Sequence, residues 1–152
     1  MPHLAQYNIA RARAPLSDPA LAGFVSEIAK LNAIAEQSPG FVWRLTDDTG
    51  ASSSYVRAYK DELMLINLSV WESVEALRTY THSEPHVGMF RRRREWFEPH
   101  PGPSLVMWWI PEGHIPTVKE AAGRLEHLES HGPTPYAFTF KQSFASQLSA
   151  AV

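Results

Sequence analysis

Residues 63–71 read LMLINLSVW, the clearest strand of the sequence, because Leu, Ile and Val fill most of the run. One polar residue, Asn67, interrupts the middle of this apolar segment. Ser73, two residues after the end of this strand, is a favourable helix-capping residue. A short helix is therefore expected from there to about Thr81. The remaining elements can be placed around this strand and helix.

The other predicted elements lie before and after this strand and helix in the sequence. Upstream, we expect a strand over 3–10, a helix from Asp18-Pro19 to about Gln37 and a strand over 41–46, with a short strand or an irregular edge at 55–59. Downstream, a helix that begins at Ser83 precedes a strand over 105–110. The order strand, helix, strand, strand, helix, strand predicts an α+β fold. It is the ferredoxin-like βαββαβ arrangement, with helices on one face of an antiparallel sheet.

Residues 117–140 extend this core. Thr117 to Glu120 form a capping box, which predicts a further helix that Gly132-Pro133 ends. Residues 136–140 then either add an edge strand or reach across to a partner chain. We therefore expect a single domain over 1–140 and a weakly ordered, Ser- and Ala-rich tail over 141–152.

Both faces of the predicted strands carry large apolar side chains. Helices on one face would leave the other face exposed to water, which is unfavourable for so much apolar surface. The economical solution is a homodimer whose sheets pack face to face and close a dimeric α/β barrel across a two-fold axis.

The composition excludes several classes of protein. A net charge of −2 over 152 residues argues against general nucleic-acid binding, and the four arginines from Arg91 point in different directions on a helix. The absence of cysteine excludes disulfides and thiolate metal sites. No apolar run is long enough for a signal peptide or a membrane span, so we expect a cytoplasmic protein without a membrane partner.

Residues 81–97, THSEPHVGMFRRRREWF, contain the clearest candidate for a binding surface. On a helical period one face collects an imidazole, a guanidinium and several apolar groups, namely His86, Met89, Phe90, Arg93, Trp96 and Phe97. A purely structural helix seldom turns such polar groups toward a core, because unpaired polar burial is costly. We interpret this face as one wall of a small-molecule pocket.

His86 and Asn67 are the candidate catalytic residues. The ordinary pKa of histidine suits proton transfer at neutral pH, so His86 is a candidate general base, haem ligand or hydrogen-bond donor to an oxyanion, or a structural group bonded to a carbonyl. Asn67 either presents its amide to the interior or holds a β-bulge. Asn8 and Gln6 lie on the face of the first strand that Leu4 helps define, and we expect one of them in the site and the other in solvent.

The remaining candidates are substrate-binding residues. Arg93 either recognises an anion or forms an ion pair with Glu72 or Glu95, whereas Arg44 is expected at the surface. Aromatic walls suit a flat ligand, although large rings also fill small barrels. Because adjacent strand residues alternate in direction, only one of Trp108 and Trp109 can face the pocket. The substrate-binding set is Asn8, Trp71, Met89, Phe90, Arg93, Trp96, Trp108 and His114, the last of which either contacts ligand or holds the appendage.

Other motifs are missing or weak. His127 and His131 have a metal-compatible spacing, but no third ligand is evident, and we expect them at the surface, with His100 in a loop. The sequence has no phosphate loop, nucleotide-binding glycine pattern, nucleophile elbow or zinc pattern. No metal site is therefore predicted, apart from His86 if haem is bound.

Six stretches together resemble the family called domain of unknown function 3291. They are residues 3–6, 41–45, 67–73, 90–97, 108–116 and 132–135. This family resembles a branch of the dimeric α/β-barrel superfamily, which includes antibiotic-biosynthesis and haem-degrading monooxygenases, chlorite dismutases and small isomerases or cyclases. In some haem-binding relatives a histidine on the corresponding helix is the iron ligand, and His86 is the matching position here.

The resemblance implies a small-molecule enzyme. Our leading hypothesis is a monooxygenase-like oxidoreductase that acts on a flat apolar or phenolic, natural-product-like substrate, either without a cofactor or with haem. In the cofactor-free case His86 is the base or acid and Asn67, with Asn8, stabilises the oxyanion. The alternatives are a haem enzyme with His86 as axial ligand, a cofactor-free cyclase, isomerase or lyase, and a non-catalytic ligand-binding protein.

Overall fold

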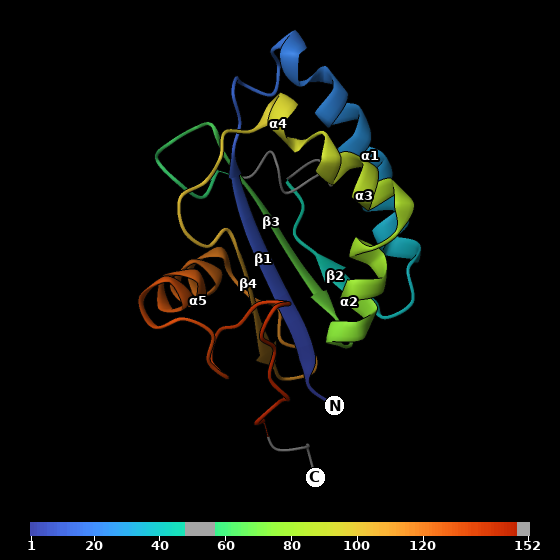
Figure 1. Ribbon diagram of the computed structural model, residues 1–152. Helices are drawn as coiled ribbons and strands as arrows, with labels where there is room; N and C mark the ends of the chain where they lie inside the picture. The colour runs from blue at the N-terminus through green and yellow to red at the C-terminus, as the bar shows by residue number, and fades with distance from the viewer. Residues whose placement is uncertain (48–56, 149–152) are drawn as a thin grey trace.

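The computed structural model describes residues 1–47 and 57–148 (Figure 1). Its elements, in chain order, are β1 (His3–Arg11), the 3₁₀ turn η1 (Pro19–Leu21), α1 (Ala22–Gln37), β2 (Phe41–Arg44), β3 (Met64–Trp71), α2 (Val74–Thr81), α3 (Glu84–Arg91), α4 (Arg93–Trp96), β4 (Leu105–Ile110) and α5 (Val118–His131). Among residues 57–59 there is no strand, and the rest of the possible strand at 55–59 lies outside the described residues.

The four strands form one antiparallel sheet in the order β2-β3-β1-β4. With two helical segments crossing between strands, this is the ferredoxin-like α+β fold, and the predicted fold class is confirmed. The register of the two central strands places Asn8 opposite Asn67 and Gln6 opposite Ser69. Because side chains alternate along a strand, all four point to the same face of the sheet.

Local capping fixes where two of the helices begin. The Ser73 hydroxyl accepts a hydrogen bond from the backbone N–H of Ala76 at 3.0 Å, and Thr117 does the same for Glu120 at 3.1 Å. Both helix starts agree with the prediction, since each hydroxyl satisfies an N–H group that the helix itself leaves unpaired. At the far end of α5, Gly132 takes a positive φ of 72° where a side chain would be strained.

The prediction of a single helix from Ser83 to Phe97 is wrong in the middle of this range. The helix breaks at Arg92, whose N–H bonds to the carbonyl of Met89 rather than to a residue four positions back. The tightened turn starts the short helix α4, which directs Trp96 into a cluster with Leu21 and Phe24. Packing of one indole against α1 has therefore overridden continuous helical periodicity.

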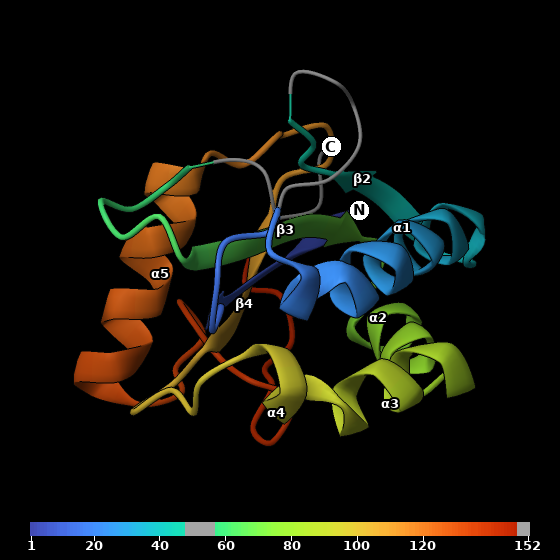
Figure 2. The ribbon, with the colours of Figure 1, turned by 90° about the horizontal axis from the view of Figure 1, so that it is seen from above.

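The helices of the βαββαβ core lie on one face of the sheet, as predicted, and the appended α5 covers the other face, which we expected to be exposed. Helices α1 to α4 lie over the face of Asn8 and Asn67, while α5 lies over the opposite face (Figure 2). The α5 side is a well-packed core in which Ala5, Tyr7 and Trp108 are fully buried. The exposed apolar face from which we predicted a dimer is thus largely covered by the chain's own appendage, and the homodimer stays a prediction.

The segment after α5 returns to the sheet beside β4. Phe138 and Met107 exchange two backbone hydrogen bonds, of 2.8 and 2.9 Å, so one residue of the predicted edge segment pairs with β4. Part of the predicted tail is also packed, because the Trp109 indole donates to the carbonyl of Phe144 at 2.8 Å. No helix among the described residues is both long and apolar enough to cross a membrane.

Candidate functional site

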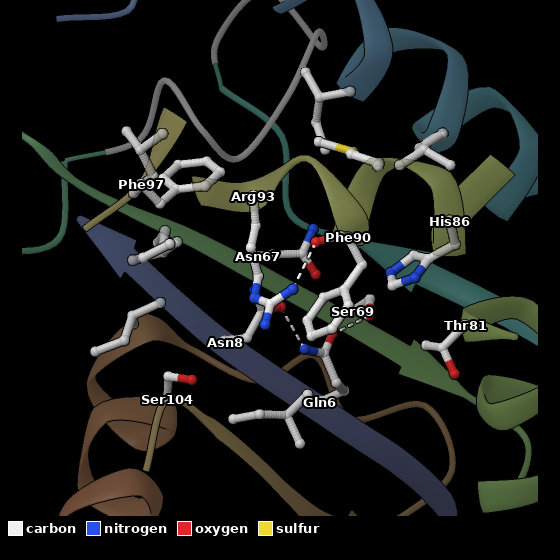
Figure 3. A pocket seen from close by; sticks show the side chains of 18 of the residues that line it. Gln6, Asn8, Asn67, Ser69, Thr81, His86, Phe90, Arg93, Phe97 and Ser104 are labelled. Carbon is white, nitrogen blue, oxygen red and sulfur yellow. Dashed lines mark hydrogen bonds between the residues drawn. The ribbon is translucent and has the colours of Figure 1, made fainter. Parts of the chain in front are cut away.

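A cavity of about 560 Å³ lies between the sheet and helices α1 to α4 (Figure 3). Its wall includes all six residues of the helical face singled out in the sequence, His86, Met89, Phe90, Arg93, Trp96 and Phe97. The break at Arg92 does not remove any of them from the wall. Trp71 lines the same space from the end of β3, so apolar and aromatic groups make up much of the surface, as in many small-molecule sites.

The floor of the cavity is a polar strip on β1 and β3. Asn8 and Asn67 are direct cross-strand partners, and Gln6 and Ser69 form the next row. All four line the cavity, which corrects the expectation that one of Gln6 and Asn8 would face solvent. The reason is strand alternation, because residues two apart share a face.

A hydrogen-bond chain fixes the orientation of this strip. The Trp71 indole N–H donates to the Ser69 hydroxyl at 3.0 Å, and this hydroxyl donates to Oε1 of Gln6 at 2.9 Å. The Gln6 amide nitrogen then donates to Oδ1 of Asn8 at 2.6 Å. Because an indole N–H can only donate, it fixes the donor and the acceptor of each hydrogen bond in this series, so that Asn8 accepts through Oδ1. The chain leaves the NH₂ group of Asn8 as a donor at the cavity.

Asn67 completes a pair of amides on the floor. Within the described part of the chain its side chain makes no hydrogen bond, although it stands directly opposite Asn8. In the view of Figure 3 the two amides are drawn on either side of the guanidinium of Arg93. Three groups that can donate to an oxygen atom therefore lie around one part of the cavity.

His86 lies in an aromatic row on the helical wall. Its ring contacts the edge of Tyr80 at a centroid distance of 5.3 Å, and Tyr80 stacks on Trp71 at 5.1 Å. Burial lowers the pKa of His86 below its ordinary value of 6.5, against the smaller opposing effect of a hydrogen bond with the Thr81 backbone. The imidazole is therefore neutral at pH 7, which is the form that can accept a proton or bind a metal.

Tyr80 is held as a neutral phenol. Its hydroxyl donates to the carbonyl of Leu31 at 3.2 Å, and burial raises its pKa to about 12. The residue consequently serves as a packed wall beside His86, not as a proton acceptor at neutral pH.

Arg93 lies over the Phe90 ring, with its guanidinium carbon 4.0 Å from the ring centroid, and donates to the Phe90 carbonyl at 3.0 Å. It forms no ion pair within the described residues, and Glu95 pairs with Arg92 instead. The alternative of an Arg93 ion pair with Glu72 or Glu95 is therefore wrong. Among the lining residues that the structure describes, the one carboxylate is Glu98, which is held by Arg11 at 2.8 Å.

Arg44 lies elsewhere than expected. It stands in register with Ser69 and lines the cavity, whereas we expected a surface residue. Its side chain is only 13% exposed and pairs with Glu36 at 2.7 Å. Because this carboxylate already neutralises Arg44, Arg93 is the better candidate for binding an anion.

Trp108 and His114 do not line the cavity, so their assignment to this site is wrong. Trp108 points to the α5 side of the sheet, where its indole donates to Glu120 at 3.0 Å. His114 contacts the other oxygen of Glu120 at 2.8 Å. Trp109 has the opposite orientation from Trp108, but the C-terminal segment packs over it.

The sequence analysis missed several lining residues, of which Asn32 is the most informative. Asn32 lies in α1, is 6% exposed and borders the cavity. Its signal was present, because it follows Ile28 by four residues and so falls on the apolar stripe of the helix. Ser69 and Thr81 gave no such signal, since small hydroxyl residues are common in strands and at helix ends.

The possible metal and cofactor ligands are few. Among the described residues no group of three His, Cys, Asp or Glu side chains is arranged to hold a metal ion. The imidazoles that line the cavity are His86 and His100. His127 and His131 stack on each other on α5, with ring centroids 4.2 Å apart, and neither lines the cavity.

The fold is similar to that of several solved structures. Protein SO0527 from Shewanella oneidensis is 7% identical, with a TM-score of 0.53 over 72% of this chain and 91% of that chain. SnoaB, a cofactor-independent oxygenase from Streptomyces nogalater, is 15% identical, with a TM-score of 0.50 over 76% and 97%. NE2512, a protein of unknown function from Nitrosomonas europaea, is 10% identical, with a TM-score of 0.50 over 77% and 97%. At these identities the likeness concerns the fold alone.

Nearly the whole chain matches one sequence family. No curated protein matches the sequence. The model of one family matches residues 3–152. The chain belongs to this family, which is described as Domain of unknown function (DUF3291).

Proposed function

We propose that this chain is a monooxygenase-like enzyme that oxidises a flat, apolar or phenolic molecule in the cavity between the sheet and the helices. The observation that carries the proposal is the meeting of a neutral imidazole, His86, with the amides of Asn8 and Asn67 and the guanidinium of Arg93 in one aromatic-walled space. A base beside donors for a developing anion is what deprotonation of a phenol requires. SnoaB, which has the same fold, is described as a cofactor-independent oxygenase, and this supports the reaction class.

The proposed chemistry needs only the substrate and dioxygen. His86 takes the phenolic proton, and the amides of Asn8 and Asn67 stabilise the resulting oxyanion, whose charge is delocalised onto a ring carbon. That carbon forms a C–O bond with dioxygen, and the proton held by His86 is transferred to the outer oxygen to give a hydroperoxide. The hydroperoxide then breaks its O–O bond and loses the outer oxygen with the ring C–H proton as water, which gives a quinone. One oxygen atom of dioxygen enters the product and the other leaves as water, so the substrate supplies all the electrons.

The test is oxygen consumption with a panel of phenols and naphthols of one to three rings. We expect His86→Ala to lower the rate for any active member of the panel by about 10²- to 10⁴-fold, the usual contribution of a general base. The fold should be retained, because His86 is only partly buried.

His82 provides the matched control. It is exposed, lies four residues before His86 and bonds through Nδ1 to the Arg78 carbonyl at 2.8 Å, outside the cavity. His82→Ala should leave the rate unchanged. Full activity in His86→Ala would refute the assigned base, and ligand binding without any chemical change by mass spectrometry would favour a non-catalytic binding protein.

Haem binding is the second candidate, and the neutral state of His86 favours it. A neutral imidazole is the axial ligand of many haem proteins, and Arg93 and Arg94 at the cavity wall could pair with the propionates. Haem would supply an iron centre for oxygen or peroxide chemistry. A Soret band that appears on adding haem and is lost in His86→Ala would establish this alternative, and its absence would leave the cofactor-free proposal.

A further inference from the structure

Asn32 is a buried amide that finds no partner among residues 1–47 and 57–148. It is 6% exposed, yet its side chain makes no hydrogen bond in the described part of the chain. Gln6 and Ser69, the other buried polar side chains among the described residues, are both hydrogen-bonded. An amide in this state costs free energy unless another group pairs with it.

The amide borders open cavity space and is not sealed within the core. Among the described residues, Ser83 Oγ is the one buried side-chain atom that is closed off without a partner. Asn32 instead lines the cavity, with Ile28, Leu31 and Ala35 at helical spacing on the same face of α1. A bound molecule can therefore reach it.

The surroundings of Asn32 indicate a neutral group. The residues of α1 that line the cavity are Phe24, Ile28, Leu31, Asn32 and Ala35, and none is charged. An amide presents both a carbonyl acceptor and an NH₂ donor, which suits a hydroxyl or a carbonyl oxygen. The sheet floor differs, because Asn8 presents donors there beside the cationic Arg93.

We infer that Asn32 forms a second polar subsite, which binds a neutral hydroxyl or carbonyl group of the same ligand whose anionic oxygen lies near Asn8 and Arg93. The ligand class is then a flat aromatic anion with a second, uncharged oxygen function on another edge. This inference rests on the proposed function of the cavity, because it assumes that the cavity holds a small molecule.

The probes are 2-naphthoate and its 6-hydroxy and 7-hydroxy derivatives, titrated into the whole protein by calorimetry. These ions share one anionic group and differ only in the presence or position of a neutral hydroxyl. We expect at least one hydroxylated probe to bind the unmodified protein about fivefold more tightly than 2-naphthoate, the usual worth of one neutral hydrogen bond. In Asn32→Leu this advantage should disappear, while the affinity for 2-naphthoate itself is kept.

A purely structural role for Asn32 predicts the opposite behaviour. Leucine has the same number of side-chain heavy atoms and the same branching at Cγ as asparagine, favours helices and suits the apolar stripe, so the melting temperature of Asn32→Leu should rise. Gln37→Leu is the control, since Gln37 is an exposed amide on the same helix outside the cavity. It should leave all three affinities unchanged.

Three results would overturn the inference. They are a hydroxyl advantage that persists in Asn32→Leu, the absence of any advantage or of any naphthoate binding in the unmodified protein, and a fall in melting temperature on the substitution. These readouts are independent of turnover. Activity that survives His86→Ala would refute the proposed base without affecting the subsite.

Discussion

The two faces of the sheet carry similar residues, but they differ in how many of the polar side chains are hydrogen-bonded within the protein. On the α5 face, Trp108 and His114 share the carboxylate of Glu120, and the hydroxyls of Tyr7 and Tyr59 bond to each other at 2.8 Å. Each of these side chains has a protein partner, and Ala5, Val106 and Leu128 around them are buried.

On the cavity face, polar groups are left over. Asn67 and Asn32 have no side-chain partner within the described residues, and Asn8 keeps its NH₂ group after the Trp71–Ser69–Gln6 chain is complete. Aromatic rings and histidines therefore do not by themselves mark a site. What distinguishes the candidate site is polar capacity that the protein does not use.

The largest effect should come from breaking the packed face. Trp108 is fully buried, so Trp108→Ala should lower the free energy of unfolding by about 3–5 kcal/mol, measured by urea denaturation. Trp109→Ala is the matched control on the opposite face, where the ring is only partly buried, and should cost about 2 kcal/mol. Equal losses for the two substitutions would contradict the contrast between the faces.

A smaller effect, on binding alone, should come from the cavity face. Arg93→Gln removes a cation that has no carboxylate partner, so the affinity for 2-naphthoate should fall about tenfold, with little change in stability. Added salt should weaken binding to the unmodified protein in the same direction.

Arg92 is the natural comparison for Arg93. It is the preceding residue, pairs with Glu95 at 2.9 Å and lies outside the cavity. Arg92→Gln should leave the affinity for 2-naphthoate unchanged. If both substitutions weaken binding equally, the guanidinium of Arg93 has no specific role and only the net charge matters.

Most of the fold was predictable because its signals are local. The caps at Ser73 and Thr117, the alternation in β1 and the apolar runs of β3 and β4 fix these elements to within about two residues. The break at Arg92 was not predictable, since it accompanies the packing of Trp96 against Leu21 and Phe24, which are far away in the sequence. Tertiary contact decided that geometry, which no sequence window contains.

The candidate site was predictable where it follows one periodic face. The residues of 86–97 that share a helical face all line the cavity, because a break of one residue does not rotate them away from it. Trp108 was misplaced because alternation says that Trp108 and Trp109 diverge without saying which face holds the cavity. Placing α5 on the Trp108 side required the three-dimensional structure.

The smallest expected effect is the pH dependence that His86 contributes to stability. Its pKa is lowered from 6.5 in the folded protein by burial, whereas in the unfolded chain it keeps the ordinary value. Between the folded-state and unfolded-state pKa values, the unfolded chain binds more protons at His86 than the folded protein does. The contribution of His86 to stability is therefore fully present above about pH 7 and is lost as the pH falls through 6.5 toward the folded-state pKa. The free energy of unfolding should therefore fall less steeply between pH 7 and pH 5 in His86→Gln than in the unmodified protein. An identical slope for His86→Gln would mean that the imidazole is hydrated in the cavity and that burial does not lower its pKa.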